Sequence, residues 1–487
     1  MANSNENLRR RVGGRPCAIL GLGVSNLPLA EALCEMGIFL SVYDKKSVSE
    51  LGERAAALEA RGVRFVTGAN CFDTVEGELI FRSPGIRPDI PALVAAKERG
   101  AEITSEMELF LELTVADTYG ITGSDGKTTS TTLTGEFLRA GREGKTFVGG
   151  NIGTPLLPLC DQMSERDSAV VELSSFQLMG VTHSVRAAAV TNLSPNHLDW
   201  HTDMAEYGAA KRRILGKETV RFVTNAESDA TARMAKEEIA KGEREVILFS
   251  SRRRSFADFS EFQSAENHRF SAIYERDSVI LLSDGGEEIS LLKTEHIRVP
   301  GRHNVENFMT AMALTYGKVD VAVYESVARA FGGVEHRLEH VRTLDGVDFY
   351  NSSIDSSPSR TAAALSALAG RDIVVICGGY DKKISFEPLA ESLCAHARCV
   401  VLTGATRDAI RKAIESCPDY DEKSLQVLTE PDFARAVVLA RSVAVRGGCV
   451  LLSPACASFD AFRNFAERGN TFKAIVRAFD ISKDTKC

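Results

Sequence analysis

The chain has 487 residues, which is too long for a single hydrophobic core, and we expect three domains. Its 58 Lys and Arg residues against 66 Asp and Glu residues give a net charge of -8, spread along the chain, which argues against a nucleic-acid partner or a basic membrane patch. The 11 cysteines stand at irregular spacings, as in proteins with reduced thiols, so we expect a cytoplasmic protein. No stretch approaches the ~18 apolar residues of a membrane span, so membrane insertion is not expected either.

Short apolar runs that end in Gly or Ser alternate with helical patterns along the chain. Examples are CAILGLG, LIFRSPG, SAVVELSS, DIVVICGG and CVLLSPA. This alternation predicts the α/β class, with mostly parallel sheets flanked by helices. We place the domains at residues 1–105, 106–334 and 335–487. The first and third are expected to be Rossmann-like, and the central one P-loop-like.

The first domain carries half of a dinucleotide-binding fingerprint. Gly21 and Gly23 follow an apolar run and open a helical pattern, and Asp44 ends the next run, but Asn26 stands where the third glycine belongs. A second glycine loop, at residues 83–85, ends another strand pattern. Two such loops suit a nucleoside diphosphate over a helix N-terminus, while a simple tight turn is the alternative for the first loop.

The second domain begins with YGITGSDGKTTST, which departs from the P-loop pattern because Ile121 replaces its first glycine. Gly123 and Gly126 allow backbone N–H groups to face phosphate, Lys127 supplies a positive charge, and Thr128 can bind Mg²⁺. A strand, glycines, Lys-Thr and a helix in this order predict an ATP site.

Three further candidates follow in the same domain, and the first is Asn151 in GGNIGTP. Glu172 ends an apolar run, where a buried carboxylate is costly unless it meets a cation, which favours a Mg²⁺ ligand. His197 and His201 stand four residues apart, a spacing that also fits a zinc pair, although no HExxH motif or nearby Cys supports one. A hydrogen-bonded structural imidazole is the other alternative for either histidine.

Several of these motifs together resemble the Mur ligase family over nearly the whole chain. The motifs are GITGSDGKTTST, NIGTP, ELSSFQL, TNLSPNHLDWH, YGAAKRRIL, GRHNVENF, EHRLE and SPACASFDAFRNFAERGNTF. The resemblance implies a three-domain enzyme with a UDP-binding first domain, an ATPase middle domain and a mobile third domain. The last motif is similar to that of family members that add D-glutamate to UDP-N-acetylmuramoyl-L-alanine through an acyl phosphate.

The resemblance also implies ATP and two Mg²⁺ ions as cofactors, small-molecule substrates only, and a monomer. The implied catalytic residues are Lys127, Glu172, His197 and Lys211. The implied ATP-binding residues are Gly123, Ser124, Asp125, Gly126, Lys127, Thr128, Thr129, Asn304, Asn307 and Arg337. The implied UDP-substrate residues are Gly23, Val24, Ser25, Asp44, Lys45, Ser83, Pro84, Gly85, Asn151 and His197. The implied amino-acid residues are Lys382, Ser458, Phe459 and Ser356, and the implied metal ligands are Thr128, Glu172, His197 and Lys211.

Two positions, Lys211 and Ser352, have alternative interpretations. The pattern around Lys211 alone favours a solvated helix lysine, whereas the resemblance implies a lysine carbamylated by CO₂ that orients Mg²⁺. Ser352 stands where the family commonly has an acidic residue that helps to bind the ATP ribose. Either Asp355 replaces that carboxylate or ATP binds more weakly, and the sequence leaves both alternatives open.

Two rival functions remain at this stage. One is another amide ligase with the same ATPase core, such as a folylpolyglutamate synthase or a different Mur ligase, and the first domain and the last motif argue against it. The other is a catalytically inactive nucleotide-binding regulator, which only the Ser352 departure favours.

Overall fold

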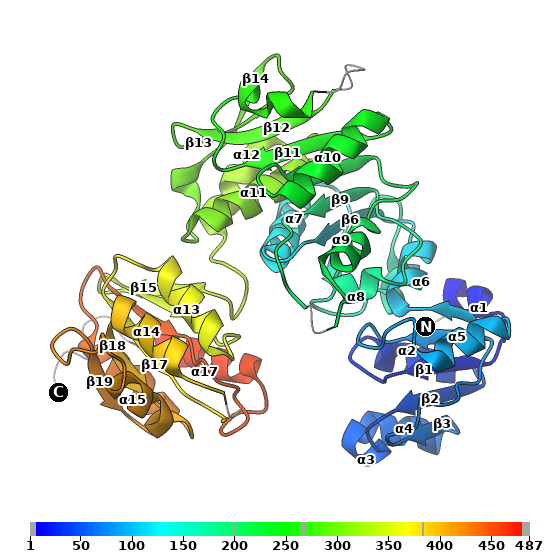
Figure 1. Cartoon of the computed structure of the whole chain (residues 1–487), viewed down its shortest axis with the longest axis horizontal. Coiled ribbons are helices and arrows are strands. Elements are labelled where there is room, and N and C mark those ends of the chain that lie inside the picture. Colours follow the sequence, from blue (N-terminus) through cyan, green and yellow to red (C-terminus); the bar gives the residue numbers. More distant parts are fainter. Residues whose placement is uncertain (1–5, 198–199, 264–268, 382–383, 480–487) are drawn as a thin grey trace. The chain divides into compact units, whose positions relative to one another are not determined.

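The computed structural model describes residues 6–197, 200–263, 269–381 and 384–479. Its strands form three sheets flanked by helices, with mostly parallel neighbours, so the predicted α/β class is confirmed (Figure 1). Internal contacts divide the chain into two compact units, Met1–His296 with His303–Val327, and Ile297–Arg302 with Ala328–Cys487. The first unit holds two of the sheets and the second unit holds the third. Within the described ranges, no helix has the length and apolar character needed to cross a membrane.

The first sheet has five parallel strands in the order β3-β2-β1-β4-β5. Its strands are β1 (Cys17–Leu20), β2 (Leu40–Asp44), β3 (Arg64–Thr67), β4 (Leu79–Arg82) and β5 (Glu102–Thr104). Its helices are α1 (Glu6–Val12), α2 (Asn26–Glu35), α3 (Val48–Leu51), α4 (Glu53–Ala60) and α5 (Pro91–Glu98). Strands β1 and β4 are buried throughout, as expected for a parallel sheet covered on both faces. The strand order reverses between β1 and β4, so the loops after these two strands mark the place at the carboxyl edge where such sheets bind ligands.

The middle sheet has nine strands in the order β14-β13-β12-β11-β10-β9-β6-β8-β7, of which β13 and β14 form an antiparallel hairpin at one edge. Its strands are β6 (Asp117–Thr122), β7 (Thr146–Gly150), β8 (Ser168–Glu172), β9 (Ala187–Val190), β10 (Arg221–Asn225), β11 (Glu245–Ser250), β12 (Ser271–Arg276), β13 (Val279–Ser283) and β14 (Glu288–Lys293). The α-helices of this region are α6 (Glu106–Leu113), α7 (Lys127–Gly141), α8 (Ser175–Leu178), α9 (Met204–Arg212), α10 (Asp229–Lys241), α11 (Arg302–Thr315) and α12 (Val321–Ala330), and its 3-10 helices are Leu157–Gln162, Phe256–Phe262 and Thr294–His296. The neighbouring strands β9, β6 and β8 bring the loops that follow them to one place.

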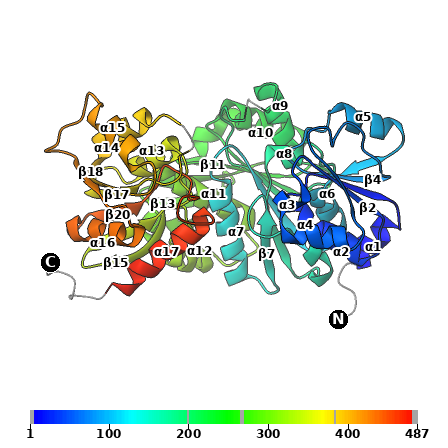
Figure 2. The same ribbon diagram turned by 90° about the horizontal axis from the view of Figure 1, so that it is seen from below.

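The third sheet has six strands in the order β15-β16-β20-β17-β18-β19, and only the β15-β16 pair is antiparallel. Its strands are β15 (Glu339–Leu344), β16 (Val347–Asn351), β17 (Ile373–Cys377), β18 (Ala397–Leu402), β19 (Gln426–Thr429) and β20 (Cys449–Leu452). Its helices are α13 (Pro358–Ala367), α14 (Glu387–His396), α15 (Arg407–Glu415), α16 (Phe433–Val443) and α17 (Phe465–Ala478). Figure 2 shows α13, α14 and α15 on one face of this sheet and α16 and α17 on the other. The adjacent strands β17 and β20 are therefore followed by helices on opposite faces of the sheet, an arrangement that marks a ligand-binding place at the carboxyl edge.

Candidate functional site

The loop between β6 and α7 has a backbone that requires two glycines. Gly123 has a φ of 144° and Gly126 a φ of 78°, both in the region that side chains disfavour. A Cβ atom at Gly123 would overlap the Thr191 hydroxyl, and one at Gly126 would overlap the side-chain oxygen of Asn307. The close approach of these neighbours leaves the loop no room for any other residue at either position.

Lys127 and Ser124 hold this loop from two sides. The Nζ atom of Lys127, the first residue of α7, donates to the carbonyl oxygens of Gly123 and Ser124 at 2.9 Å each. The Ser124 hydroxyl donates to the carbonyl oxygen of Ser194 at 3.0 Å and lies 3.1 Å from the Tyr207 hydroxyl. The loop is thereby fixed to the segment after β9 and to helix α9.

Glu172 ends β8 beside this loop and is 1% exposed. Its Oε1 atom accepts a hydrogen bond from Asn151 Nδ2 at 2.8 Å. Its Oε2 atom is buried and has no hydrogen-bond partner among the described residues. Because a buried carboxylate oxygen without a partner is costly, Glu172 fits the requirement for a bound cation.

The donor set around Glu172 fits Mg²⁺ better than zinc. In the part of the chain that the structure describes, no three His, Cys, Asp or Glu side chains gather as a metal site. Mg²⁺ takes oxygen ligands and commonly binds one or two carboxylates together with waters and phosphate oxygens. Glu172 supplies such a carboxylate, and the hydroxyl of Thr128 follows Lys127 at the start of α7.

Lys211 is buried at 2% exposure near the end of α9, which contradicts the solvated helix lysine that its local pattern alone favours. Its Nζ atom donates to the Gly123 carbonyl oxygen at 2.8 Å and to Thr122 Oγ1 at 3.4 Å, and it lies 4.6 Å from the centre of the Tyr207 ring. Burial, assisted by the charge of Lys127, lowers the pKa of Lys211 to about 7. Near neutral pH, about half of an amine with this pKa is the neutral nucleophile, far more than for an exposed lysine.

The two histidines have different surroundings. His197 is exposed, has a φ of 54°, and its ring lies 4.9 Å from that of Phe176. His201 is 2% exposed, with Nε2 at 2.9 Å from Ser175 Oγ and Nδ1 at 3.3 Å from Glu206 Oε2. Because both ring nitrogens of His201 have partners, it is a structural imidazole, and the zinc-pair alternative has no support.

Most of the residues predicted to bind the UDP-linked substrate lie at the carboxyl edge of the first sheet, whereas Asn151 and His197 follow β7 and β9 of the middle sheet. Asp44 ends β2, and its Oδ2 atom accepts a hydrogen bond from the backbone N–H of Leu22, at 2.8 Å, in the loop after β1. A Cβ atom at Gly21 would lie 3.0 Å from the Cβ atom of Ser83, in the loop after β4. The two loops therefore meet where the strand order reverses. Gly23, Val24, Ser25, Pro84 and Gly85 belong to the same two loops, and Lys45 lies in the loop after β2.

The predicted nucleotide residues are divided between the units. Asn304 and Asn307, on α11, are buried, and Asn307 Nδ2 donates to Asn304 Oδ1 at 3.1 Å. Asn307 also accepts a hydrogen bond from Ser130 Oγ on α7 at 3.3 Å, so the pair lies beside the glycine loop. Arg337 belongs to the second unit, in the turn before β15, and its backbone N–H donates to Val334 at 2.9 Å.

The predicted amino-acid residues lie in the second unit, apart from Lys382, which is outside the described residues. Ser458 is buried, whereas Phe459 is 65% exposed and its ring lies 6.0 Å from that of Tyr380. Ser356 is partly exposed in the segment after β16. The loops after β17 and β20 meet here, since Tyr380 and Ala457 form a β-bridge.

Asp355 lies beside Ser352 in the same turn. It is 6% exposed and accepts a hydrogen bond from the Ser453 hydroxyl at 2.9 Å, with the Ser352 side chain beside it. Burial raises the pKa of Asp355 despite these contacts. This carboxylate is thus close to position 352, where the family resemblance implies an acidic residue, but its hydrogen bond to Ser453 is directed inward.

Sequence reasoning missed several residues that support the site. Arg82 is 2% exposed and holds the loop after β4, and the ring of Tyr207 covers Lys211. The only local signal for Arg82 is a charged residue inside an apolar strand. Trp200 and Arg87 contact each other across 113 positions of sequence, which no local pattern predicts.

Comparison with protein-family models gives three matches in chain order. Residues 15–105 match the Mur ligase MurD-like N-terminal domain, and residues 121–315 match the Mur ligase middle domain. Residues 336–456 match the Mur ligase glutamate ligase domain.

Known proteins agree with these matches. A UDP-N-acetylmuramoylalanine–D-glutamate ligase from Clostridium novyi (strain NT) is 43% identical over 469 residues, which cover 96% of this chain and 97% of that protein. The crystal structure of the UDP-N-acetylmuramate-alanine ligase MurC from Thermotoga maritima matches with a TM-score of 0.53 at 17% identity, over 95% of this chain and 99% of that one. The MurF ligase from Thermotoga maritima in complex with ADP matches with a TM-score of 0.50 at 15% identity, over 90% and 95% of the two chains. At these identities the two structures show a common fold.

Proposed function

The chain belongs to the Mur ligase family, and we propose that it joins D-glutamate to UDP-N-acetylmuramoyl-L-alanine with hydrolysis of ATP, in the synthesis of peptidoglycan precursors. One structural observation supports phosphoryl transfer as the type of reaction. The partnerless oxygen of Glu172 and the buried amine of Lys211 both lie beside a glycine loop that opens helix α7. This arrangement suits phosphoryl transfer, where charge must be placed around phosphate oxygens. The full-length relative from Clostridium novyi supports the choice of substrates.

The first step activates a carboxylate. The γ-phosphoryl group of ATP moves to the L-alanyl carboxylate, so that ADP leaves and an acyl phosphate forms. Backbone N–H groups of the loop from Gly123 to Thr129 bind the phosphates, and Lys127 neutralises their developing charge. Asn304, Asn307 and Arg337 contribute to the nucleotide site.

The second step forms the amide. The amine of D-glutamate, once it has lost a proton, attacks the acyl carbon, and inorganic phosphate leaves. Ser356, Lys382, Ser458 and Phe459 bind D-glutamate. Ser458 and Ser356 offer hydroxyl donors, and Lys382 offers a cation, which suits a substrate with two carboxylates.

Two Mg²⁺ ions would meet the cation requirement, and the residues that would hold them are Thr128 and Glu172 for one ion and His197 and Lys211 for the other. Bound Mg²⁺ would offset the negative charge of the phosphates and polarise the phosphoryl group. For this purpose Lys211 would carry a carbamate: the ammonium first loses one proton, the neutral amine attacks CO₂, and a second proton is released, so that a cation becomes an anion with two oxygen donors. Burial of the amine supports this modification, because the neutral form is the one that reacts.

The three sheets belong to three domains, at residues 1–105, 106–334 and 335–487, and each domain binds a different substrate. The first binds the UDP moiety through Gly23, Val24, Ser25, Asp44, Lys45 and the loop at 83–85, together with Asn151 and His197 of the second. The second binds ATP, and the third binds D-glutamate. Because both ATP and UDP-linked precursors are cytoplasmic metabolites, the enzyme acts in the cytoplasm, and we take it to be a monomer.

Phosphate release tests this function. Purified protein with ATP, Mg²⁺ and UDP-N-acetylmuramoyl-L-alanine should release phosphate with D-glutamate about 100-fold faster than with L-glutamate, L-lysine or meso-diaminopimelate, because a pocket built for a second carboxylate of fixed hand rejects the others. A UDP substrate without the L-alanyl group should give no turnover, because it lacks the carboxylate that lies at the correct distance from the γ-phosphoryl group of ATP. Equal rates with L-lysine would contradict the proposal.

A further inference from the structure

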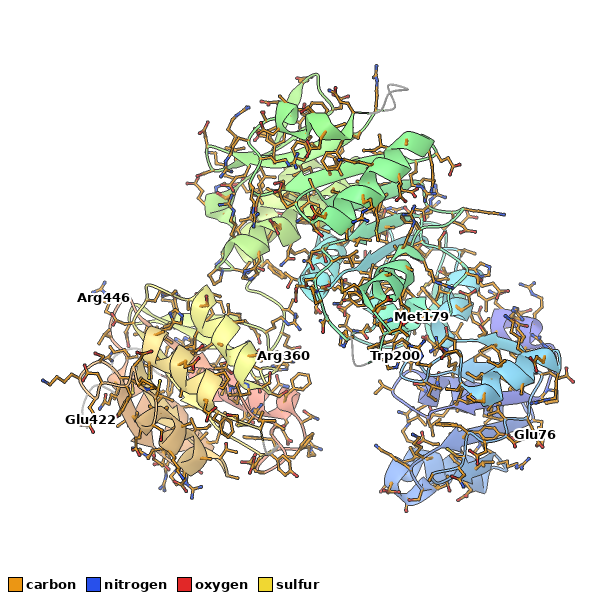
Figure 3. The ribbon with its side chains drawn as sticks, in the orientation of Figure 1. Glu76, Met179, Trp200, Arg360, Glu422 and Arg446 are labelled. Atoms are coloured by element: carbon orange, nitrogen blue, oxygen red, sulfur yellow. The ribbon has the colours of Figure 1, made fainter. Side chains whose placement is uncertain are left out.

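Trp200, the single tryptophan of the chain, joins loops of the first and middle sheets. Its Nε1 atom donates to the carbonyl oxygen of Gly85, in the loop after β4, at 3.3 Å. Its ring lies 4.6 Å from that of Phe176 on α8 and 4.7 Å from that of His201. Trp200, labelled in Figure 3, is thus held by elements of both sheets within the first unit.

Arg87, in the segment after β4 of the first sheet, also contacts Trp200. Its guanidinium lies 5.0 Å from the centre of the Trp200 ring and donates to the Trp200 carbonyl oxygen at 2.7 Å. The same group binds both carboxylate oxygens of Glu206, at 2.9 and 3.2 Å, and both of Asp89. Glu206 lies in the first turn of α9, the helix that carries Lys211. We define Arg87, Trp200 and Glu206 as the Trp200 clamp.

Arg82 gives the loop after β4 its shape independently of the clamp. Its buried guanidinium donates to the carbonyl oxygens of Ser83, at 3.4 Å, Pro84, at 3.3 Å, and Ile86, and to that of Phe176 at 3.2 Å. Three of these four acceptors belong to the loop itself. A change at Arg87 therefore leaves the loop its own internal support.

The Trp200 clamp connects two parts of the site that must act on one substrate molecule. The loop at residues 83–85 belongs to the edge that binds the UDP moiety, whereas α8 follows Glu172 and α9 carries Lys211. From this geometry we propose that Arg87 and Trp200 are positioning residues, which fix the span between the UDP-binding edge and the phosphoryl-transfer residues and so select a substrate of matching length. The inference rests on the proposed function, because it assumes a substrate with UDP at one end and the reacting carboxylate at the other.

The physical reason is the advantage of binding both ends of one ligand. When the two subsites are held at the correct distance, the second end binds at a high effective concentration, and the reacting atoms start close together. A looser connection reduces this advantage without changing either subsite. The full substrate should then bind less tightly, while UDP alone binds as before.

The test compares Arg87→Met with wild type and with Arg64→Met. Methionine keeps the apolar stem at 87 but removes the bonds to Trp200 and Glu206. Arg64 forms an ion pair with Glu76 in the same sheet, at 3.0 Å, and is 54% exposed, so it is a matched control. Calorimetry should give Arg87→Met an unchanged Kd for UDP and a Kd for UDP-N-acetylmuramoyl-L-alanine weakened about tenfold. Its kcat should fall, its KM for ATP should stay constant, and its Trp200 emission should shift to the red, while Arg64→Met should match wild type throughout.

Other outcomes separate the alternatives. Equal weakening of UDP and of the full substrate by Arg87→Met would mean that the loop itself had been damaged, and would overturn the positioning role, as would unchanged binding of both. If Arg87→Met does not fold, Glu206→Gln, which weakens the same ion pair from the α9 side, should reproduce the selective loss. Failure of wild-type protein to bind UDP-N-acetylmuramoyl-L-alanine would contradict the proposed function and this inference together.

Discussion

The carboxylate of Asp355 accepts a hydrogen bond from the Ser453 hydroxyl at 2.9 Å, and the side chain of Ser352 lies beside the same carboxylate in the turn after β16. An acidic residue at 352 would therefore meet a second carboxylate already buried beside it. Of the two alternatives for the missing acidic residue, replacement by Asp355 requires that this carboxylate turn outward. Its inward hydrogen bond to Ser453 favours the other alternative, in which ATP binds more weakly.

The first prediction follows from this pair. Ser352→Asp alone should not improve the KM for ATP and should lower the thermal unfolding temperature, because two adjacent buried carboxylates cannot both ionise without cost. The double variant Ser352→Asp with Asp355→Ser should lower the KM for ATP about fivefold, the ~1 kcal/mol expected of one added hydrogen bond to the ribose. Steady-state kinetics on both variants make the comparison. A fully improved KM in the single variant would show that Asp355 does not oppose the new charge.

The second prediction concerns Lys127, whose ammonium holds the glycine loop. Lys127→Ala should reduce phosphate release by about 100-fold or more, since an electrostatic contact to the transferred group is lost. Binding of UDP-N-acetylmuramoyl-L-alanine, measured by calorimetry, should be unaffected because the UDP edge belongs to another sheet. Lys145→Ala, at an exposed position of the same domain, is the control. Undiminished turnover in Lys127→Ala would remove this residue from the mechanism.

The third prediction is a pH dependence of stability that arises at Glu106. This residue is 4% exposed on α6, and burial raises its pKa to about 7, although its Oε1 atom accepts a hydrogen bond from the Leu157 N–H at 3.0 Å. The folded state thus holds the proton more tightly than the unfolded state does. The stabilisation is complete below the unfolded pKa, near 4.5, and is lost as the pH rises through about 7.

Glu106→Gln keeps the acceptor oxygen but never ionises. Its unfolding temperature should match that of wild type at pH 4, exceed it increasingly from pH 5 to 7, and change little above that. The difference in unfolding free energy has an upper bound on the order of 3 kcal/mol. Glu53→Gln, at an exposed site, should show no such trend. Thermal unfolding followed by circular dichroism at each pH measures the difference, and parallel curves for wild type and Glu106→Gln would rule out an ionising Glu106.

The fold class could be predicted because buried parallel strands leave a direct trace in sequence. Strands such as β1 and β8 are buried throughout and mostly apolar, and Gly21 follows β1 while Glu172 ends β8. The antiparallel hairpin of β13 and β14 was not predicted, because the apolar run of β13, VILLS, resembles a buried parallel strand, and β14, EISLLK, mixes polar with apolar residues.

The site could be predicted in part, for a different reason. Glycines at 123 and 126 are required by backbone angles, and Glu172 by the cost of burial, so each is visible locally. Lys211 looks like a surface lysine because the elements that bury it are remote in sequence. Only the resemblance to a family indicated its role. The Arg87–Trp200 contact likewise depends on how two sheets pack.

The fourth prediction is that Lys211 acts as a carbamate. As an amine, Lys211 donates to the Gly123 carbonyl oxygen at 2.8 Å. A carbamate keeps one N–H for this bond and adds two acceptor oxygens, which the amine cannot offer to a metal ion. Lys211→Ala should therefore slow acyl-phosphate formation by orders of magnitude, while circular dichroism shows a folded protein.

Small carboxylates distinguish the carbamate from a structural lysine. Formate or acetate in excess should restore part of the activity of Lys211→Ala, because the lost group is chemically a carboxylate and the truncated side chain leaves room for one. Lys211→Met, which fills that space with apolar atoms, should gain nothing from either anion. Lys211→Arg should be no more active than Lys211→Ala, since a guanidinium retains the charge but is not carbamylated. Full activity in Lys211→Arg, or in wild-type enzyme stripped of CO₂ and shown by mass spectrometry to be unmodified, would make Lys211 a buried structural cation that bonds to the loop.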